Sequence, residues 1–455
     1  YPGLPRSRRA EPRRRSSPPP SLFAAEKSLD ALVIHAVLAR KPCGYLMTRR
    51  CVVLGLVLAL LCIDRAAGND LPPAKPEQVG LSPERLERIG QVLRNDVERG
   101  RIPGAVVVVV RSGKVASVQA VGFRDKAAGA TITPDAIFRL ATMTKPLVTV
   151  AALSLYEEGR LILSDPVSKY IPALKTQTVG LERVPVEREM TVQDLMRHTS
   201  GLTYGNRGTT EIYKMYPESS NVASQTLTMD EFITKLSRVP LLYQPGTRWE
   251  YGLSTDVLGR VVEVAAGKPL GEVLAERIYR PLKMTDTTFL VPGDKRGRIA
   301  QGLPTNPDTG AEYKLVDPTV PRKFDCGGGC AVSTAGDYAK FAQMLLNRGT
   351  LNGVRVLGSR TVELMTADHL GAISHGTGAT GWPGYTWGLG VAVRQEKGIA
   401  PIAGSPGDFY WPGAFATYWW ADPKEDLAVV FMTQSPLGRH YQHLIRGLVY
   451  QAITN

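Results

Sequence analysis

The chain has 455 residues, of which 43% are hydrophobic, and it carries a formal net charge of +13 at pH 7. This length allows one large domain or a few small ones, because a domain usually holds roughly 100–200 residues. Residues 1–68 contain 12 Lys and Arg against 4 Asp and Glu, so the rest of the chain carries only +5. Binding to nucleic acid requires a concentrated basic face, and we therefore expect no nucleic-acid partner.

The first 68 residues have the composition of a segment that is removed or left unfolded. Residues 1–46 are rich in Arg, Pro and Ser, which predicts disorder or translated upstream sequence with Met47 as the true start. Residues 47–68 combine a basic start, an apolar run from Cys51 to Cys62 and small residues at the end, which predicts a signal peptide. A bilayer span needs about 20 apolar residues. We therefore expect no stable membrane anchor and a periplasmic or secreted location.

The globular part begins with one helix and one hairpin. Residues 81–100 place apolar side chains at helical spacing and end at Gly100, which predicts an amphipathic helix. Two runs of β-branched residues, 105–110 and 115–123, follow on either side of a turn at Gly113. This pattern predicts a β-hairpin.

Helical patterns dominate the middle of the chain, and strand patterns return near its end. Helices are expected at residues 147–160, 192–198, 228–238 and 255–267. Strands are expected at residues 387–394, 414–421 and 427–434, before a final helix at residues 436–453.

This order of elements predicts one α/β (α+β) domain at residues 69–455. Strands at both ends indicate a single sheet, flanked by helices, with a mainly helical lobe inserted between its two parts. We place the sheet lobe at about 69–140 and 335–455 and the helical lobe at about 141–334.

One candidate for chemistry is the pair Thr142 and Lys145, three residues apart where a helix begins. Residues i and i+3 share a helix face, so the hydroxyl and the amine can approach each other. The positive end of the helix dipole would stabilise an oxyanion and lower the pKa of Lys145, as a lysine that activates a hydroxyl requires. The spacing alone is common by chance, so the surrounding sequence decides its meaning.

Several long segments resemble, in the same order, those of the serine hydrolases related to class C β-lactamases. The segments are FRLATMTKPL, YEEGRLILSDPVSKYIPAL, LMRHTSGLTYG, WEYGLSTDVLGRVVEVAAG, GGGCAVSTAGDYAKFAQMLLNRG and WPGAFATYWWADPKEDLAVVFMTQ. The resemblance covers about residues 76–450 and is greatest to the esterase branch of the family. It implies a β-lactamase/transpeptidase-like fold and a hydrolase that needs no metal or cofactor.

The resemblance also implies a role for each motif. The nucleophile motif of the family, S-x-x-K, falls on Thr142 and Lys145, with threonine in place of serine. The tyrosine that relays the proton falls on Tyr251. The third motif, K-T-G in β-lactamases and often W-G-G in the esterases, falls on Trp411-Pro412-Gly413, which would contact the substrate. The backbone N–H groups of Thr142 and Ala414 would form the oxyanion hole.

Two departures from the family pattern indicate the substrate. Leu253 stands where β-lactamases have an asparagine, and Trp411 replaces the lysine that would pair with a substrate carboxylate. An aromatic, uncharged pocket favours a neutral ester. We therefore expect an exported hydrolase that cleaves small carboxylic esters through an acyl-enzyme on Thr142, activated by Lys145 and Tyr251.

Two other functions stay open. The first is a β-lactamase or D-Ala-D-Ala carboxypeptidase. The second is a catalytically silent pseudohydrolase, because the methyl group of Thr142 crowds the attacking oxygen and restricts χ1. A misplaced nucleophile costs about a hundredfold in rate. The sequence does not indicate the oligomeric state.

Four other features are given structural interpretations. His198 is expected to form structural hydrogen bonds, because the G-x-S-x-G motif of Ser-His-Asp hydrolases is absent. Residues 376–381 match G-x-G-x-x-G but lack a following helix pattern, so a loop is expected there. Tyr204 could edge the acyl pocket or pack in the interior, and packing is favoured. Cys326 and Cys330 flank three glycines, and a disulfide or two free thiols are equally compatible with this spacing.

Overall fold

The computed structural model of the protein describes residues 70–373 and 382–454. Residues 69–455 form one compact unit. The expectations for residues 1–68 and for the loop at 376–381 concern parts of the chain outside the described residues.

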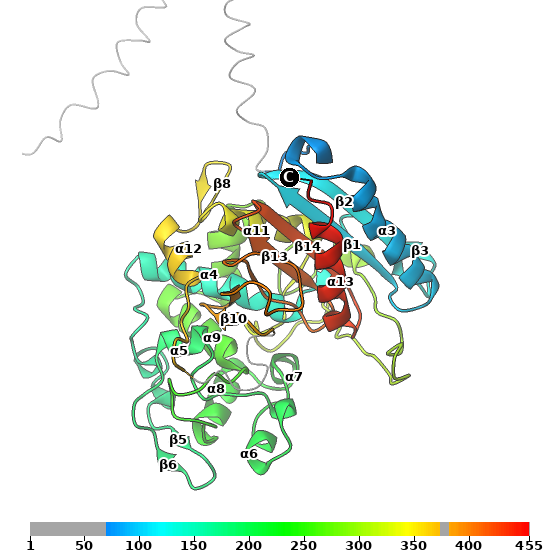
Figure 1. The fold of residues 1–455 in the computed structure, drawn as a ribbon. Coiled ribbons are helices and arrows are strands. Elements are labelled where there is room, and N and C mark those ends of the chain that lie inside the picture. The colour runs from blue at the N-terminus through cyan, green and yellow to red at the C-terminus, as the bar shows by residue number, and fades with distance from the viewer. Residues whose placement is uncertain (1–69, 374–381, 455) are drawn as a thin grey trace, which may run out of the picture. The chain divides into compact units, whose positions relative to one another are not determined.

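An eight-stranded antiparallel sheet forms the centre of the fold (Figure 1). Its strands are β1 (Gly104–Arg111), β2 (Lys114–Asp125), β3 (Ala130–Thr131), β10 (Tyr385–Trp387), β11 (Ala392–Arg394), β12 (Phe409–Tyr410), β13 (Tyr418–Asp422) and β14 (Leu427–Thr433). The strand order is β10-β11-β12-β13-β14-β1-β2-β3, so early and late parts of the chain meet where β1 pairs with β14. The expected fold class, an antiparallel sheet built from both ends of the domain, is confirmed.

Helices cover both faces of this sheet (Figure 1). Helices α3 (Pro83–Glu98) and α13 (Gly438–Tyr450) pack together on one face, and α11 (Ala335–Leu346) contacts β1, β13 and β14 from the other. Every residue of β1 is buried. A strand covered on both faces has no polar side, which explains the uninterrupted valines at residues 106–110.

Local signals at the start of the domain act as expected. The hydroxyl of Ser82 accepts a hydrogen bond from the backbone N–H of Arg85 and caps α3. Ser112 and Gly113 connect β1 to β2 with φ angles of 52° and 69°, the left-handed pair found in a two-residue hairpin turn. The predicted first helix and hairpin are both confirmed.

The single strand expected at residues 387–394 is wrong. The structure divides this segment between β10 and β11, which pair antiparallel with Trp387 opposite Ala392. Gly390 between them has a φ of 75°, a conformation that glycine adopts without steric cost. The glycines therefore allow a chain reversal where the apolar residues suggest one continuous strand.

Helices are the longest regular elements in the middle of the chain, and all four predicted helices are confirmed. The helices of this part are α4 (Thr144–Glu157), α5 (Val192–Met196), α6 (Glu211–Lys214), α7 (Ser220–Thr226), α8 (Met229–Arg238), α9 (Ser254–Ala266) and α10 (Leu270–Leu274), and α12 (Ser359–Met365) follows α11. Helix α9 contacts both α4 and α5. Most of α4 is buried, so a polar side chain on this helix must find its partners inside the protein.

Three short strand pairs complete the fold. They are β4 (Phe138–Arg139) with β7 (Val332–Ser333), β5 (Thr178–Val179) with β6 (Val184–Pro185), and β8 (Thr350–Leu351) with β9 (Val354–Arg355). The first pair matters for the site, because it places the segment before Thr142 beside the segment that follows Cys330.

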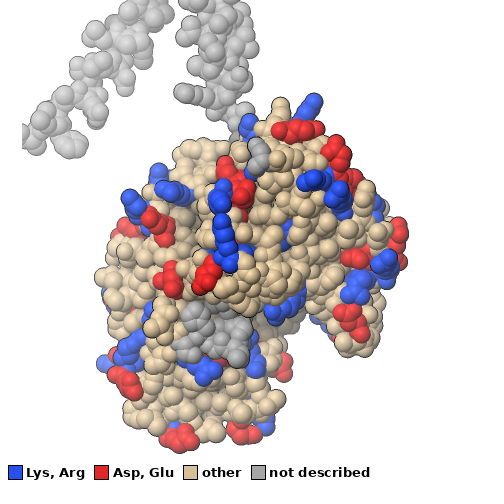
Figure 2. Space-filling model, viewed as in Figure 1, with Lys and Arg blue, Asp and Glu red and all other residues tan. Residues whose placement is uncertain are grey.

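The charged residues are mixed on the face shown in Figure 2, where Lys and Arg alternate with Asp and Glu. Within residues 70–373 and 382–454, no helix is both long enough and apolar enough to cross a membrane. The expectations about nucleic acid, membrane anchor and location stay predictions.

Candidate active site

Thr142 lies in a single turn of 3₁₀ helix, Ala141–Met143, that leads into α4. Ala141 has a φ of 47°, which is uncommon for a residue other than glycine. Thr142 is half-buried, and its hydroxyl donates a hydrogen bond to the backbone carbonyl of Pro412. The turn therefore directs the expected nucleophile toward the expected third motif.

Lys145 is completely buried in the first turn of α4. Its Nζ donates to the carbonyl of Gly328 at 2.5 Å and to the hydroxyl of Tyr204 at 3.1 Å. It also lies 4.7 Å from the ring centroid of Tyr251. Burial lowers the pKa of Lys145, but Tyr204, Tyr251 and Asp256 raise it more, so the net pKa is above the ordinary value. This direction is opposite to the predicted lowering of the Lys145 pKa.

The amine of Lys145 belongs to a closed ring of hydrogen bonds. The hydroxyl of Tyr204 lies 3.1 Å from Ser220 Oγ, which donates to Asp256 Oδ2 at 2.6 Å. The Asp256 Oδ1 accepts from the Gly328 N–H at 2.8 Å. The Gly328 carbonyl accepts from Lys145 Nζ and so closes the ring. Burial raises the pKa of Tyr204 to about 12, although Lys145 acts in the opposite direction. Burial also raises the pKa of Asp256, again against the effect of Lys145.

Sequence reasoning missed most of this ring. Tyr204 is buried, as the favoured interpretation predicts, but its hydroxyl also accepts a hydrogen bond from the amine of Lys145. Ser220, Asp256 and Gly328 come from three separate segments, and no local spacing relates them. The sequence offers one indication of a buried role for Asp256, because it is an acidic residue within an apolar helix pattern.

Tyr251 lies shortly before α9, which begins at Ser254, and packs against aromatic neighbours. The indole N–H of Trp411 donates to its hydroxyl at 3.0 Å, and the two ring centroids are 5.3 Å apart. A donor at this oxygen stabilises negative charge on it. Trp411, expected as a substrate contact, therefore positions Tyr251 in this structure. Leu253 is fully buried, so its expected contact with substrate stays a prediction.

The backbone after Trp411 approaches the nucleophile turn closely. The N–H of Gly413 donates to the Thr417 carbonyl at 2.7 Å, and a Cβ at residue 413 would collide with the carbonyl of Leu140. Only glycine fits there. Ala414 follows in an exposed turn. The roles of Pro412 and Gly413 in binding, and of the Ala414 and Thr142 N–H groups as an oxyanion hole, stay predictions.

His198 is fully buried, and neither ring nitrogen has a hydrogen-bond partner within the described part of the chain. Its ring packs against Tyr251 and Trp387, with centroid distances of 4.7 and 5.4 Å. Burial, Lys145 and Arg207 lower its pKa well below the usual value. The predicted hydrogen-bonding role is wrong, and His198 acts as a neutral ring that supports Tyr251.

Asp194 anchors the segment that leads to His198. Its carboxylate is buried and accepts hydrogen bonds from Arg188 at 2.6 Å, Arg197 at 2.9 Å and Thr199 at 2.6 Å. Burial alone would raise its pKa, but the donors, with Arg188 the largest, hold it at about 2. The charged carboxylate therefore stabilises the folded protein.

We expect this contribution to disappear in acid. Because the folded pKa of Asp194 is below its ordinary value, its stabilisation is complete above about pH 4 and is lost as the pH falls toward 2. The loss amounts to about 2 kcal/mol of the free energy of unfolding. Urea unfolding of Asp194→Asn and wild type between pH 2 and pH 7 checks this.

The variant should be less stable at neutral pH and should lack this part of the acid dependence. The control is Glu363→Gln, which removes an exposed ion pair with Arg360 and should leave the wild-type pH dependence unchanged. Equal pH dependence in Asp194→Asn and wild type would contradict the assignment.

Together these residues define a class of protein. A hydroxyl, a lysine and a tyrosine are the groups that acyl-transferring hydrolases require. In this structure Lys145 lies over the Tyr251 ring, and the Thr142 hydroxyl bonds Pro412, the residue after the Trp411 that bonds Tyr251. Within the described ranges, no group of three or more His, Cys, Asp or Glu side chains is placed to hold a metal ion.

Comparison with known proteins gives the family. A family model described as Beta-lactamase matches residues 89–450, so the chain belongs to the β-lactamase family, and it is a hydrolase of the β-lactamase-related group. The chain is 36% identical to Protein Rv1367c of Mycobacterium tuberculosis over 357 residues, which cover 75% of this chain and 88% of that protein.

Two further similarities concern proteins with stated activities. Esterase EstB of Burkholderia gladioli is 29% identical over 367 residues, covering 76% of this chain and 90% of EstB. The solved structure of EstCE1, described as a hydrolase with promiscuous acyltransferase activity, superposes with a TM-score of 0.70. It is 26% identical and covers 81% of this chain and 98% of EstCE1.

Proposed function

We propose that this hydrolase is an esterase that cleaves neutral carboxylic esters through an acyl-enzyme on Thr142. The observation that carries the proposal is the placement of the buried Lys145 cation 4.7 Å from the ring of Tyr251. Because Trp411 also donates to the Tyr251 oxygen, an ammonium group and an N–H donor together favour negative charge on that oxygen. The similarity to esterase EstB supports the substrate class.

In the first step, Thr142 Oγ1 attacks the carbonyl carbon of the ester. Its proton passes to Tyr251, which in this proposal begins the cycle as a phenolate stabilised by Lys145 and the Trp411 N–H and becomes a neutral phenol. The carbonyl oxygen becomes an oxyanion, which accepts hydrogen bonds from the N–H groups of Thr142 and Ala414.

The second half returns the enzyme to its starting state. The tetrahedral intermediate collapses, the bond to the alcohol oxygen breaks, and the alcohol takes the proton from Tyr251. Water then attacks the acyl carbon and gives a proton to Tyr251. When this intermediate collapses, the bond to Thr142 breaks, the carboxylic acid leaves, and the Thr142 oxygen regains its proton.

The protein is also proposed to be exported, with residues 47–68 as its signal peptide. The charge and apolar pattern of that segment support this. The disulfide between Cys326 and Cys330 gives independent support, because disulfides persist mainly in oxidising compartments.

A substrate comparison tests the proposed reaction. The purified full chain is assayed with p-nitrophenyl butyrate, with nitrocefin and with a peptide ending in D-Ala-D-Ala. We expect kcat/KM to be highest for the ester, because Trp411 and Leu253 replace the polar groups that would hold a β-lactam. Faster nitrocefin or peptide cleavage would establish the alternative hydrolase, and no turnover of any substrate would favour the silent pseudohydrolase.

A further inference from the structure

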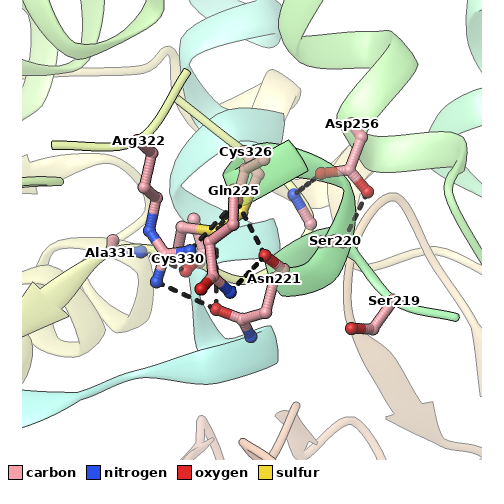
Figure 3. Close-up of a disulfide and its surroundings, with 12 residues drawn as sticks. Ser219, Ser220, Asn221, Gln225, Asp256, Arg322, Cys326, Cys330 and Ala331 are labelled. Carbon is pink, nitrogen blue, oxygen red and sulfur yellow. Dashed lines mark hydrogen bonds between the residues drawn. A yellow bond between two sulfur atoms is a disulfide. The ribbon is translucent and has the colours of Figure 1, made fainter. Parts of the chain in front are cut away.

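We propose that the Cys326–Cys330 disulfide positions Lys145, so that breaking it slows turnover. The inference rests on the proposed function, since it takes Lys145 as part of the proton-transfer site. The two Cα atoms are 5.3 Å apart and enclose three glycines (Figure 3). Both cysteines are buried, with exposed fractions of 0% and 5%.

The glycine loop makes only long hydrogen bonds within itself, between residues 326 and 330. Glycine has the largest conformational freedom in an unrestrained chain. Within the loop, the N–H groups of Gly329 and Cys330 both reach the same carbonyl, that of Cys326, at 3.3 Å. The disulfide is therefore the main covalent restraint on the conformation of Gly328.

Gly328 in the middle of the loop joins the lysine to its buried carboxylate. Its carbonyl accepts from Lys145 Nζ at 2.5 Å, and its N–H donates to Asp256 Oδ1 at 2.8 Å. A shift of this one peptide would change two of the bonds in the ring around Lys145.

The residue after the loop also supports the nucleophile turn. The Ala331 N–H donates to Thr144 Oγ1 at 3.1 Å, and the Ala331 carbonyl accepts from the Leu140 N–H at 2.9 Å. Residue 331 thus contacts the chain on both sides of Thr142.

The sulfur atom of Cys330 packs against α7, the helix that carries Ser220 of the hydrogen-bond ring. Cys330 Sγ lies 3.5 Å from Ser224 Oγ and 3.7 Å from Asn221 Oδ1, both on α7. Arg322 donates to the same two side-chain oxygens (Figure 3). Helix α7 begins at Ser220, which links Tyr204 to Asp256. The disulfide therefore contacts both segments that contribute to the hydrogen-bond ring, the loop with Gly328 and helix α7 with Ser220.

Reduction by a dithiol would break the sulfur–sulfur bond and form two thiols, while the dithiol becomes a cyclic disulfide. The Gly328 carbonyl would then lose its fixed position, and Lys145 would move relative to Tyr251. Because a misplacement of about 1 Å can cost a hundredfold in rate, we expect kcat to fall about tenfold to a hundredfold with KM little changed.

The first test compares three full-length proteins with p-nitrophenyl butyrate. They are wild type, the pair Cys326→Ser/Cys330→Ser, and a control in which Cys43, Cys51 and Cys62 are changed to Ser. Each is assayed before and after dithiothreitol treatment and desalting under nitrogen. Reduction should lower kcat in wild type and in the control but not in the Cys326/Cys330 pair, which should be slow throughout. Unchanged kcat after verified reduction would overturn the proposal.

A matched pair of glycine variants tests whether the disulfide acts on Lys145 through Gly328. A Cβ at Gly328 would collide with Asp256 Oδ2 and Ser220 Oγ, whereas a Cβ at Gly329 finds its nearest neighbour, the Ala141 carbonyl carbon, at 3.6 Å. With the disulfide intact, Gly328→Ala should lower kcat as reduction does, and Gly329→Ala should not. Equal kcat for the two variants would show that Gly328 does not position Lys145.

Hydrogen exchange separates this inference from the esterase proposal. In wild type, breaking the disulfide should speed exchange in peptides containing residues 327–331 and 140–145, while β1 and β14 stay protected. A wild-type enzyme without ester turnover would contradict the proposed function, and exchange alone would then decide whether the disulfide orders the loop. Unchanged exchange after reduction would overturn the inference even in an active enzyme.

Discussion

Replacing Thr142 with alanine is expected to reduce ester turnover to the background rate. The hydroxyl is the attacking group in the proposed reaction, and loss of a nucleophile costs about 10⁴-fold or more in kcat. The half-buried side chain makes one hydrogen bond, to the Pro412 carbonyl, so Thr142→Ala should fold as wild type does. Initial rates with p-nitrophenyl butyrate measure the loss.

Thr142→Ser tests the same assignment in the opposite direction. Serine keeps the hydroxyl and removes the methyl group that restricts χ1, so kcat should rise, by up to about a hundredfold. The matched control is Thr144→Ser, because Thr144 is a buried neighbour whose hydroxyl bonds only backbone groups. Activity that survives in Thr142→Ala would contradict the nucleophile assignment.

Lys145→Met is expected to lower kcat about 10³-fold. The change removes the positive charge beside the Tyr251 ring, and proton-transfer groups contribute about 10²–10⁴-fold to rate. The matched control is Lys169→Met, because Lys169 also lies over a tyrosine ring, at 5.5 Å from that of Tyr170, but is half exposed. Circular dichroism and kcat for both variants check the prediction.

The pH profile distinguishes this role from that of a neutral lysine base. Burial lowers the pKa of Lys145, but its net pKa lies above the ordinary value, and the proposed mechanism uses the charged amine. We expect no step in kcat from Lys145 between pH 6 and pH 9. A step present in wild type and absent in Lys145→Met would show that the neutral amine is the active form.

Much of the fold could be predicted from the sequence because local patterns and tertiary packing agree. The valines of β1 indicate a strand covered on both faces. Gly113 predicts a turn, and Ser112 and Gly113 both have left-handed φ angles there. The prediction failed at residues 387–394, where Gly390 permits a reversal that hydrophobic pattern alone does not reveal.

The candidate site could be predicted only where its residues share a motif. The resemblance assigns Thr142, Lys145 and Tyr251 to the site. In the structure Lys145 lies over the Tyr251 ring. The Thr142 and Tyr251 hydroxyls bond the neighbouring residues Pro412 and Trp411. The pKa of Lys145 shifts opposite to the predicted direction. The prediction rested on the helix dipole, which is a local effect. The buried neighbours that raise this pKa, Tyr204, Tyr251 and Asp256, lie on segments distant in sequence.

The central claim, acyl transfer through Thr142, is tested most directly by mass spectrometry of the acid-quenched reaction with p-nitrophenyl butyrate. The peptide containing Thr142 should carry one butyryl group, and the label should be absent from Thr142→Ala. Steady turnover without a labelled Thr142, or a butyryl group on another residue, would contradict the account.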